Sequence, residues 1–443
     1  ASNNTAFGYI ALQSNSTGTS NTALGSNTLQ DNTTGIENVS VGEGALDANT
    51  TGDFNTAVGS QSLSANTTGE RNTAIGRAAL NSATGVQNTA VGFNSLVNAT
   101  NGQYNTAVGS RSLANNSTAD NNTAVGTDAL LENTTGIQNV AVGALALDAN
   151  TTANNNVAVG YETLTANTIG AQNTALGSQA LEYNTEGNSN TGVGFLALFA
   201  NTTGSTNTSV GDSSSANNTT GSDNTVVGQF AFYTNTTGSD NTAVGAHALD
   251  ANTSGVENVA LGRHTLSGNT TGSSNVAIGH QALDENTTAS GNVGIGNHAL
   301  KNNHDGSNLV AVGDRALDAL GTSSSNNTAI GAHAMQNSST AEYCVAVGSL
   351  CMEDNTTGGS NTAIGHNALH ANTTGNDSIA IGKDALSVGT ALTQQLAIGN
   401  NAGKNTTGSD NVFIGHETGV SNTSGNANTS VGHRSFFHNT TGG

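Results

Sequence analysis

Residues 235–255 read NTTGSDNTAVGAHALDANTSG, and residues 355–375 repeat almost the same phrase as NTTGGSNTAIGHNALHANTTG. Aligned on the glycine of TAVG, 26 copies of this phrase fill the chain of 443 residues. These glycines recur with a period of 17, although the interval is shorter by one before Gly92 and Gly415 and longer by one before Gly331. Such an internal repeat is stronger evidence for the architecture than the length or the composition of the chain.

The repeat has the consensus N-T-A-V-G-x-x-A-L-x-x-N-T-T-G-x-x, and positions are numbered below from its first Asn. Gly stands at position 5 of every copy, and position 4 is always Val, Ile, Leu or Phe. Position 9 is Leu, Phe or Met except in three copies, which have Ser215, Gly403 and Gly419 there. These constant positions indicate the residues on which the fold depends.

The repeat is better suited to strands than to helices. A helical hairpin needs about 33 residues per repeat, and Asn, Thr and Gly are poor helix formers. The β-branched residues at positions 2 and 4 alternate as in a strand, and we expect a second short strand at positions 8–12, with turns at the glycines of positions 5 and 15. We predict an all-β fold, a parallel β-solenoid (β-roll) of about 26 coils of 17 residues. It forms a single repeat domain over residues 4–443, after a partial repeat at residues 1–3.

Strand alternation also predicts which positions face the inside of each coil. We place the aliphatic residue of position 4 and the Leu of position 9 inside, so that position 3 faces outward. The predicted structural core includes Val58, Leu63, Val108, Leu113, Val244, Leu249, Ile364 and Leu369. The turn glycines of the same copies are Gly59, Gly109, Gly245 and Gly365.

Position 3 is mostly Ala, and a row of small residues on the outer face invites close approach of another chain. The candidate protomer interface includes Ala57, Ala107, Ala243 and Ala363. A core of about one Val and one Leu per coil is thin, and small cores rarely supply enough stability alone. We therefore expect a homotrimer with the Ala rows toward its axis. The alternative is that Ala merely tolerates exposure.

Three copies resemble a repeat of a known family. DSIAIG (residues 377–382), SNVAIG (residues 274–279) and NNVAVG (residues 155–160) are similar to the NSVAIG repeat in the heads of trimeric autotransporter adhesins. The longer phrase NTAVGxxALxxNTTGxxNTAIG also resembles fibre repeats of phage tail-fibre-like proteins and proteins that contain an endosialidase-type chaperone. This resemblance covers essentially the whole chain, and it implies a trimeric, left-handed parallel β-roll in a surface-exposed fibre. The adhesin head repeat is shorter than the repeat of this chain, and no anchor, coiled-coil stalk or chaperone segment is evident, so the mode of attachment stays open.

The composition argues against several other functions. Only 9% of residues are charged, and 30 acidic residues against nine Lys and Arg give a net charge of −21. This balance disfavours nucleic acid and anionic membranes as partners. No apolar run approaches the roughly 20 residues of a membrane span. No phosphate-binding loop or Ser-His-Asp arrangement stands out, so we expect no enzymatic activity and no cofactor or metal.

Three further patterns have alternative interpretations. The NTT at position 12, as in Asn49, Asn201 and Asn235, is a glycosylation sequon, or else a ladder of Asn amides hydrogen-bonded between coils. Cys344 and Cys351 are either substitutions within the repeat or a disulfide. Eight of the 11 His stand at positions 6 or 7, where we expect solvated turn residues rather than a metal site.

The sequence therefore favours a non-enzymatic structural fibre, an adhesin shaft or head that is extracellular, on a cell surface or on a phage particle. Its expected partners are copies of itself, in a homotrimer or a longer end-to-end filament, and a host-cell or surface receptor that the sequence leaves open. Contact would use the variable positions 6, 7, 10 and 11, where many weak contacts add up. The alternative function is an ice- or glycan-binding solenoid module. Ice binding has the weaker support because position 2, mostly Thr, is expected to face inward.

Overall fold

The computed structural model describes residues 1–319 and 324–441, so the last two residues of the expected repeat domain lie outside it. Its 26 strands are three residues long, occupy positions 2–4 of the repeat and run parallel in a β-solenoid, which confirms the predicted fold class. Within those two ranges no helix is long and apolar enough to cross a membrane. The chain forms two compact units, Ala1–Ser222 and Asp223–Gly443, which are built from the same coil.

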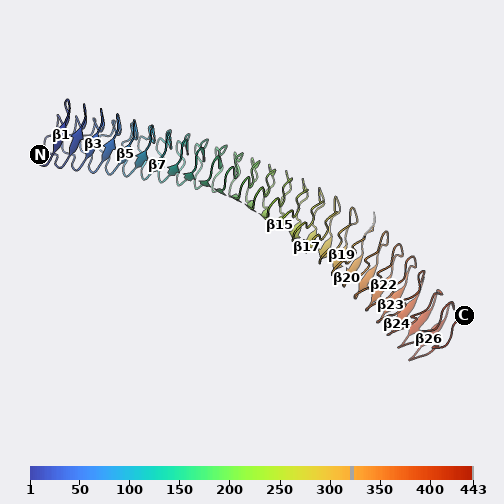
Figure 1. Cartoon of the computed structure of the whole chain (residues 1–443). Coiled ribbons are helices and arrows are strands. Elements are labelled where there is room, and N and C mark those ends of the chain that lie inside the picture. Colours follow the sequence, from blue (N-terminus) through green and yellow to red (C-terminus); the bar gives the residue numbers. More distant parts are fainter. Residues whose placement is uncertain (320–323, 442–443) are drawn as a thin grey trace. The chain divides into compact units, whose positions relative to one another are not determined.

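In each unit one strand per coil stacks on the next (Figure 1). The first unit contains β1 (Thr5–Phe7), β2 (Thr22–Leu24), β3 (Val39–Val41), β4 (Thr56–Val58), β5 (Thr73–Ile75), β6 (Thr89–Val91), β7 (Thr106–Val108), β8 (Thr123–Val125), β9 (Val140–Val142), β10 (Val157–Val159), β11 (Thr174–Leu176), β12 (Thr191–Val193) and β13 (Thr208–Val210). The second unit contains β14 (Thr225–Val227), β15 (Thr242–Val244), β16 (Val259–Leu261), β17 (Val276–Ile278), β18 (Val293–Ile295), β19 (Val310–Val312), β20 (Thr328–Ile330), β21 (Val345–Val347), β22 (Thr362–Ile364), β23 (Ile379–Ile381), β24 (Leu396–Ile398), β25 (Val412–Ile414) and β26 (Thr429–Val431).

Parallel pairing places equal repeat positions above one another within each unit. Thr56 pairs with Thr73, which holds the same position in the next copy. The irregular intervals leave this register intact, because Thr73 pairs with Thr89 and Val310 pairs with Thr328. The turns absorb the missing or extra residue, so each strand position forms a regular row.

The side chains of each strand alternate between inside and outside as predicted, but the inward and outward positions are exchanged. The predicted interface residues at position 3 are completely buried within the single chain: Ala57, Ala107, Ala243 and Ala363. The predicted core residues at position 4 are exposed or partly exposed: Val58, Val108, Val244 and Ile364. The assignment of position 4 to the core is therefore wrong, and the Ala row is not a surface that another chain can reach.

The reason is the narrow interior behind each strand. At Gly192, which occupies position 3, an added Cβ would lie 3.3 Å from Leu181 Cδ1 and 3.3 Å from the carbonyl oxygen of Ala197. A methyl group fits in this space, whereas a branched side chain would overpack it where Leu stands at position 9. Val226 is a buried exception at position 3, and the preceding copy has Ser215 in place of that Leu. Thr and Val therefore point outward, where their preference for extended backbone still favours the strand.

The Leu residues of position 9 fill the coil from the side opposite the strand, as predicted. Leu63, Leu113, Leu249 and Leu369 are all completely buried. The segment around them is a turn rather than the expected second strand. Gln61 at position 7 and Leu63 at position 9 have left-handed φ angles of 59° and 52°, which bend the chain instead of extending it. A positive φ is unusual for Leu, and burial of its side chain offsets the cost.

The glycines of positions 5 and 15 recur for different reasons. The predicted turn glycines at position 5 have φ angles between 132° and 136°, in the region that favours glycine: Gly59, Gly109, Gly245 and Gly365. Gly69 at position 15 packs closely on the next coil instead, because an added Cβ would lie 2.5 Å from the carbonyl oxygen of Gly85. Other coils accept Ala at this position, as at Ala119 and Ala153. The prediction that both glycines supply a positive φ is thus correct only for position 5.

Two ladders of Asn side chains tie consecutive coils together. At position 12, Asn49 Nδ2 donates to Asn32 Oδ1 at 2.8 Å. At position 1, the backbone N–H of Asn55 donates to Asn38 Oδ1 at 2.9 Å, and Asn55 Nδ2 donates to the carbonyl oxygen of Gly69 at 2.8 Å. All of these Asn side chains are buried, so their polar atoms need these partners. The ladder interpretation of the NTT phrase is confirmed.

The exceptions at position 9 compensate for unusual neighbours. Phe413 stands at position 3 in place of Ala, and it is completely buried. An added Cβ on Gly403 would lie 2.7 Å from Phe413 Cδ2, and a Cβ on Gly419 would also collide with this ring. Gly in place of Leu, in the same copy at Gly419 and in the preceding copy at Gly403, therefore makes the space that the phenyl ring occupies.

Candidate functional site

The side chains at positions 2 and 4 form one regular surface on each unit, called the strand face below. Position 4 is aliphatic or Phe throughout, and Leu24, Leu176 and Leu261 are almost half exposed there. Because the strands are parallel and about 4.8 Å apart, the strand face repeats at that spacing. The strand face extends along every strand of each unit, and it consists of the side chains that were expected to face inward.

In the first unit the strand face carries a run of Thr. Five adjacent strands have Thr at position 2: Thr56, Thr73, Thr89, Thr106 and Thr123. In the described part of the chain none of these hydroxyl groups forms a hydrogen bond to another protein group. The prediction that position 2 faces inward is wrong, and these hydroxyls are available to solvent.

In the second unit the strand face carries an apolar patch on four adjacent strands, β16–β19. Position 2 contributes Val259, Val276, Val293 and Val310, and position 4 contributes Leu261, Ile278, Ile295 and Val312. All eight side chains are aliphatic and are exposed or partly exposed. Contiguous apolar surfaces often mark interaction sites, so this patch is a candidate for one.

The candidate glycosylation sites lie inside the coil. Asn49, Asn201 and Asn235 are completely buried. Their side-chain amides are already donors: Asn201 Nδ2 donates to Asn184 Oδ1 at 2.7 Å, and Asn235 Nδ2 donates to the carbonyl oxygen of Gly238 at 3.1 Å. A glycosylated amide nitrogen would lose these bonds and would have no room for the sugar. The glycosylation alternative is therefore wrong for these three residues in the folded chain.

The two cysteines are free and buried substitutions at repeat positions. Cys344 replaces the Asn of position 1, and its backbone N–H still donates to Asn327 Oδ1 at 2.8 Å. Cys351 replaces the Ala of position 8, and burial raises the pKa of its thiol to about 12. The disulfide alternative is wrong, and burial raises the pKa of both thiols, which disfavours the nucleophilic thiolate form.

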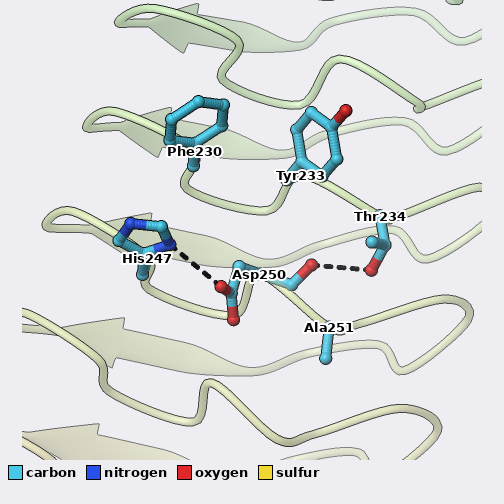
Figure 2. Close-up of a pocket in the computed structure, with 6 residues that line it drawn as sticks. All are labelled: Phe230, Tyr233, Thr234, His247, Asp250 and Ala251. Atoms are coloured by element: carbon cyan, nitrogen blue, oxygen red, sulfur yellow. Dashed lines mark hydrogen bonds and ion pairs between the residues drawn. The ribbon is translucent and has the colours of Figure 1, made fainter.

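A pocket opens on the outer surface of the second unit, away from the strands (Figure 2). Its volume is about 320 Å³, and two consecutive coils line it at the same positions, 7, 10 and 11. The lining residues are Phe230, Tyr233 and Thr234 from the first coil and His247, Asp250 and Ala251 from the next. The Thr234 hydroxyl donates to the backbone oxygen of Asp250 at 2.6 Å, which joins the two coils at the edge of the pocket.

Aromatic rings form one wall of this pocket. The Phe230 and Tyr233 rings meet edge to face, with centroids 5.6 Å apart. The His247 ring stacks on Phe230 at 5.5 Å, and the His264 ring stacks on His247 at 5.0 Å. His247 Nδ1 also lies 3.1 Å from Asp250 Oδ2. The rings are thus held in place from both coils.

Acidic residues at position 10 are partly buried rather than fully solvated. Burial raises the pKa of Asp148 to about 6, aided by the nearby carboxylates of Asp128 and Glu132. Burial also raises the pKa of Asp47 and of Asp250, although His247 opposes the shift at Asp250. These acids are therefore surface residues that the neighbouring coils partly shield from solvent.

The variable positions otherwise lie where the sequence predicts. Phe93, Tyr161 and Phe195 at position 6 are about half exposed. Among the residues that the structure describes, no three His, Cys, Asp or Glu side chains come together as a metal site would require. Comparison with models of known protein families finds no match, and no curated protein matches the chain.

The pocket is a candidate functional site that the sequence analysis did not identify. Its residues are 17 apart in pairs, such as Phe230 with His247, and each pair looks like ordinary variation at one position. The available signal is that Phe230 and Tyr233 place aromatic residues at both positions 7 and 10 of one copy, which no other copy does.

Proposed function

We propose that this chain is a non-enzymatic structural fibre protein that acts outside a cell or on a phage particle. Three copies associate side by side through their strand faces, and the outer turns make multivalent contact with a surface. The observation that carries the proposal is the strand face, where exposed aliphatic side chains repeat in every coil.

A second copy of this chain is the partner that fits the strand face best. The rows at positions 2 and 4 repeat once per strand for all the strands of a unit. A surface with the same spacing over the same length is present on another copy, so identical rows can interlock along their whole length. Burial of these side chains would add to a core that has, in most coils, only one Leu and two small residues.

Cyclic association also agrees with the resemblance to trimeric adhesin heads and phage fibre repeats. A rotation axis parallel to the stacking direction of the coils keeps corresponding coils of different copies at the same height. The aliphatic rows of one copy then face the aliphatic rows of the others. The interface moves from the buried Ala row to positions 2 and 4, as at Thr242 and Val244.

Sedimentation equilibrium of the full chain tests the assembly. The expected result is a species with three times the mass of one chain, at micromolar concentration and physiological salt. A monomer under these conditions contradicts the proposal, and a dimer contradicts its threefold form.

Ice binding is a second candidate because the Thr hydroxyls at position 2 face outward. In the first unit, Thr56, Thr73 and Thr89 lie on adjacent strands, with an aliphatic residue two positions further on each strand. A regular array of hydroxyl and methyl groups can order water at fixed spacing. Thermal hysteresis of a monomeric chain, abolished by Thr89→Lys, would favour this function over the fibre. Absence of hysteresis would remove it.

A further inference from the structure

We propose that the pocket lined by Phe230, Tyr233, His247 and Asp250 binds the uncharged ring of a carbohydrate. The inference deepens the proposed function, because it names the chemical class that the outer surface of the fibre contacts. Its biological use rests on that function, but the pocket itself lies within one chain.

The fold does not need the two aromatic residues. The coil with Gln61 and Ser64 at positions 7 and 10 adopts the same turn, with a φ of 59° at Gln61 and 52° at Phe230. The next coil there has Ala78 and Asn81 at these positions and is equally regular. Because small and polar residues suffice elsewhere, the large rings of Phe230 and Tyr233 have a role at the surface rather than in the coil.

The aromatic wall is ordered before any ligand arrives. Phe230 is fixed between the Tyr233 edge contact and the stacked rings of His247 and His264. Tyr233 remains 37% exposed. A wall that is already in place loses little conformational entropy when a ligand packs on it.

The polar groups of the pocket match the rim of a sugar ring. A pyranose has apolar C–H faces, which pack on aromatic rings, and hydroxyl groups around its edge. The Asp250 carboxylate accepts hydrogen bonds, and the Tyr233 hydroxyl both donates and accepts them. An apolar wall with a few placed polar groups is the usual composition of a small-molecule site, and about 320 Å³ suits one ring.

The charges of the pocket favour a neutral ligand. The Asp250 carboxylate would repel an anionic sugar. An organic cation would need that carboxylate unpaired, but His247 Nδ1 already lies 3.1 Å from Asp250 Oδ2.

Ligand-observed NMR titration of the full chain with the methyl glycosides of glucose, galactose, N-acetylglucosamine and fucose tests the inference. We expect at least one glycoside to bind with a Kd of about 1 mM. Tyr233→Ala and Asp250→Ala should each weaken binding by about tenfold or more. The fold accepts Ala at position 10, as at Ala114 and Ala216.

Two matched controls should leave the Kd unchanged. Tyr161→Ala removes an exposed Tyr outside the pocket, and Asp148→Ala removes an acid at the same repeat position as Asp250.

Three results would overturn the inference: no binding of any glycoside, binding that survives both pocket substitutions, or binding of tetramethylammonium in preference to the sugars. Sedimentation of the same samples reports the assembly separately. A chain that is trimeric but does not bind sugars contradicts only the pocket, and a monomer that binds sugars contradicts only the assembly.

Discussion

The two units use one coil but present different surfaces. In the first unit, position 2 of the strand face is Thr on ten of thirteen strands and Val only at Val39, Val140 and Val157. In the second unit, Thr stands at position 2 on five of thirteen strands, and the other eight are aliphatic. The second unit also holds all 11 His of the chain.

The interior rows differ as well. Position 1 is Asn in every coil of the first unit. In the second unit, four coils replace it with other buried residues: Leu309, Cys344, Ser378 and Gln395. The ladder is therefore continuous in one unit and interrupted in the other, while the backbone coil is the same in both.

The comparison of the two units shows which repeat positions the coil needs and which positions can vary. The buried Ala, Leu and Gly positions are nearly constant in both units, because their space is limited by the next coil. The strand face and outer turns vary because only solvent or a partner constrains them. The second unit has the more apolar strand face and the pocket, so in the proposed assembly we expect it to make the larger share of the intermolecular contacts.

Removal of the phenyl ring from the core of the second unit should have the largest effect. Phe413→Ala leaves a cavity because Gly403 and Gly419 offer no side chain to fill it, and we expect a loss of about 3–5 kcal/mol in the free energy of unfolding. Hydrogen exchange should report the loss in peptides around β25 and not in the first unit.

A compensating triple variant makes this prediction sharper. Gly403 and Gly419 have φ angles of 57° and 58°, close to the 52° of Leu63, so their backbone accepts Leu. Phe413→Ala combined with Gly403→Leu and Gly419→Leu recreates the usual core and should recover most of the stability. Failure to recover would contradict the volume compensation.

A reciprocal exchange at position 1 tests the ladder difference. Asn139→Cys in the first unit removes the acceptor for the Asn156 N–H and the donor to the Ala153 oxygen, and it should destabilise by about 1–3 kcal/mol. Cys344→Asn in the second unit completes an interrupted ladder and should stabilise by about 1 kcal/mol. Thermal unfolding of both variants checks the signs. Equal effects of the same sign would show that the ladder contributes nothing specific.

A charge on each strand face tests which unit carries the contacts between chains. Ile278→Asp in the apolar patch buries an unpaired carboxylate at the proposed interface and should weaken association at least about tenfold, or 1.4 kcal/mol. Thr106→Asp in the first unit should weaken it less. Sedimentation of both variants at matched concentration decides the order, and a stronger effect of Thr106→Asp would reverse our assignment.

The smallest effect concerns the partly buried acids. The folded pKa of Asp148, about 6, lies above its ordinary value of 3.8, so its contribution to stability is complete below about pH 4 and is lost as the pH rises through 6. Asp148→Asn should remove this loss and stabilise the first unit at pH 7, by less than about 1 kcal/mol after solvent screening. Asp250→Asn should gain less, because His247 favours the charged form there. Unfolding at pH 4.5 and pH 7 measures both.

Much of the coil could be predicted from one chain. The period, the parallel β-solenoid, the buried Leu of position 9 and the turn glycine of position 5 follow from internal recurrence, as at Leu249 and Gly245. The Asn ladder was the correct alternative for the NTT phrase. These features were predictable because each depends on one residue type meeting its own copy in the next coil.

The alternation of NTAVG divides the strand into two faces, but it does not say which face is inside. Propensity favours the larger aliphatic residue, such as Val244, whereas the space behind most strands suits a small residue such as Ala243. That space depends on how far the Leu of position 9 reaches across the coil, which is a property of the folded backbone. The residue types found at positions 3 and 4 are compatible with either position facing the inside of the coil.

The sequence by itself determined the repeat, its period and the residues that recur, because stacking makes equal positions neighbours. Tertiary structure alone decided the direction of the strand side chains, the division into two units and the pocket between Tyr233 and Asp250. The physical reason is that each of these depends on distances across the coil or between positions 7 and 10 of adjacent coils. A linear pattern of residue types does not contain those distances.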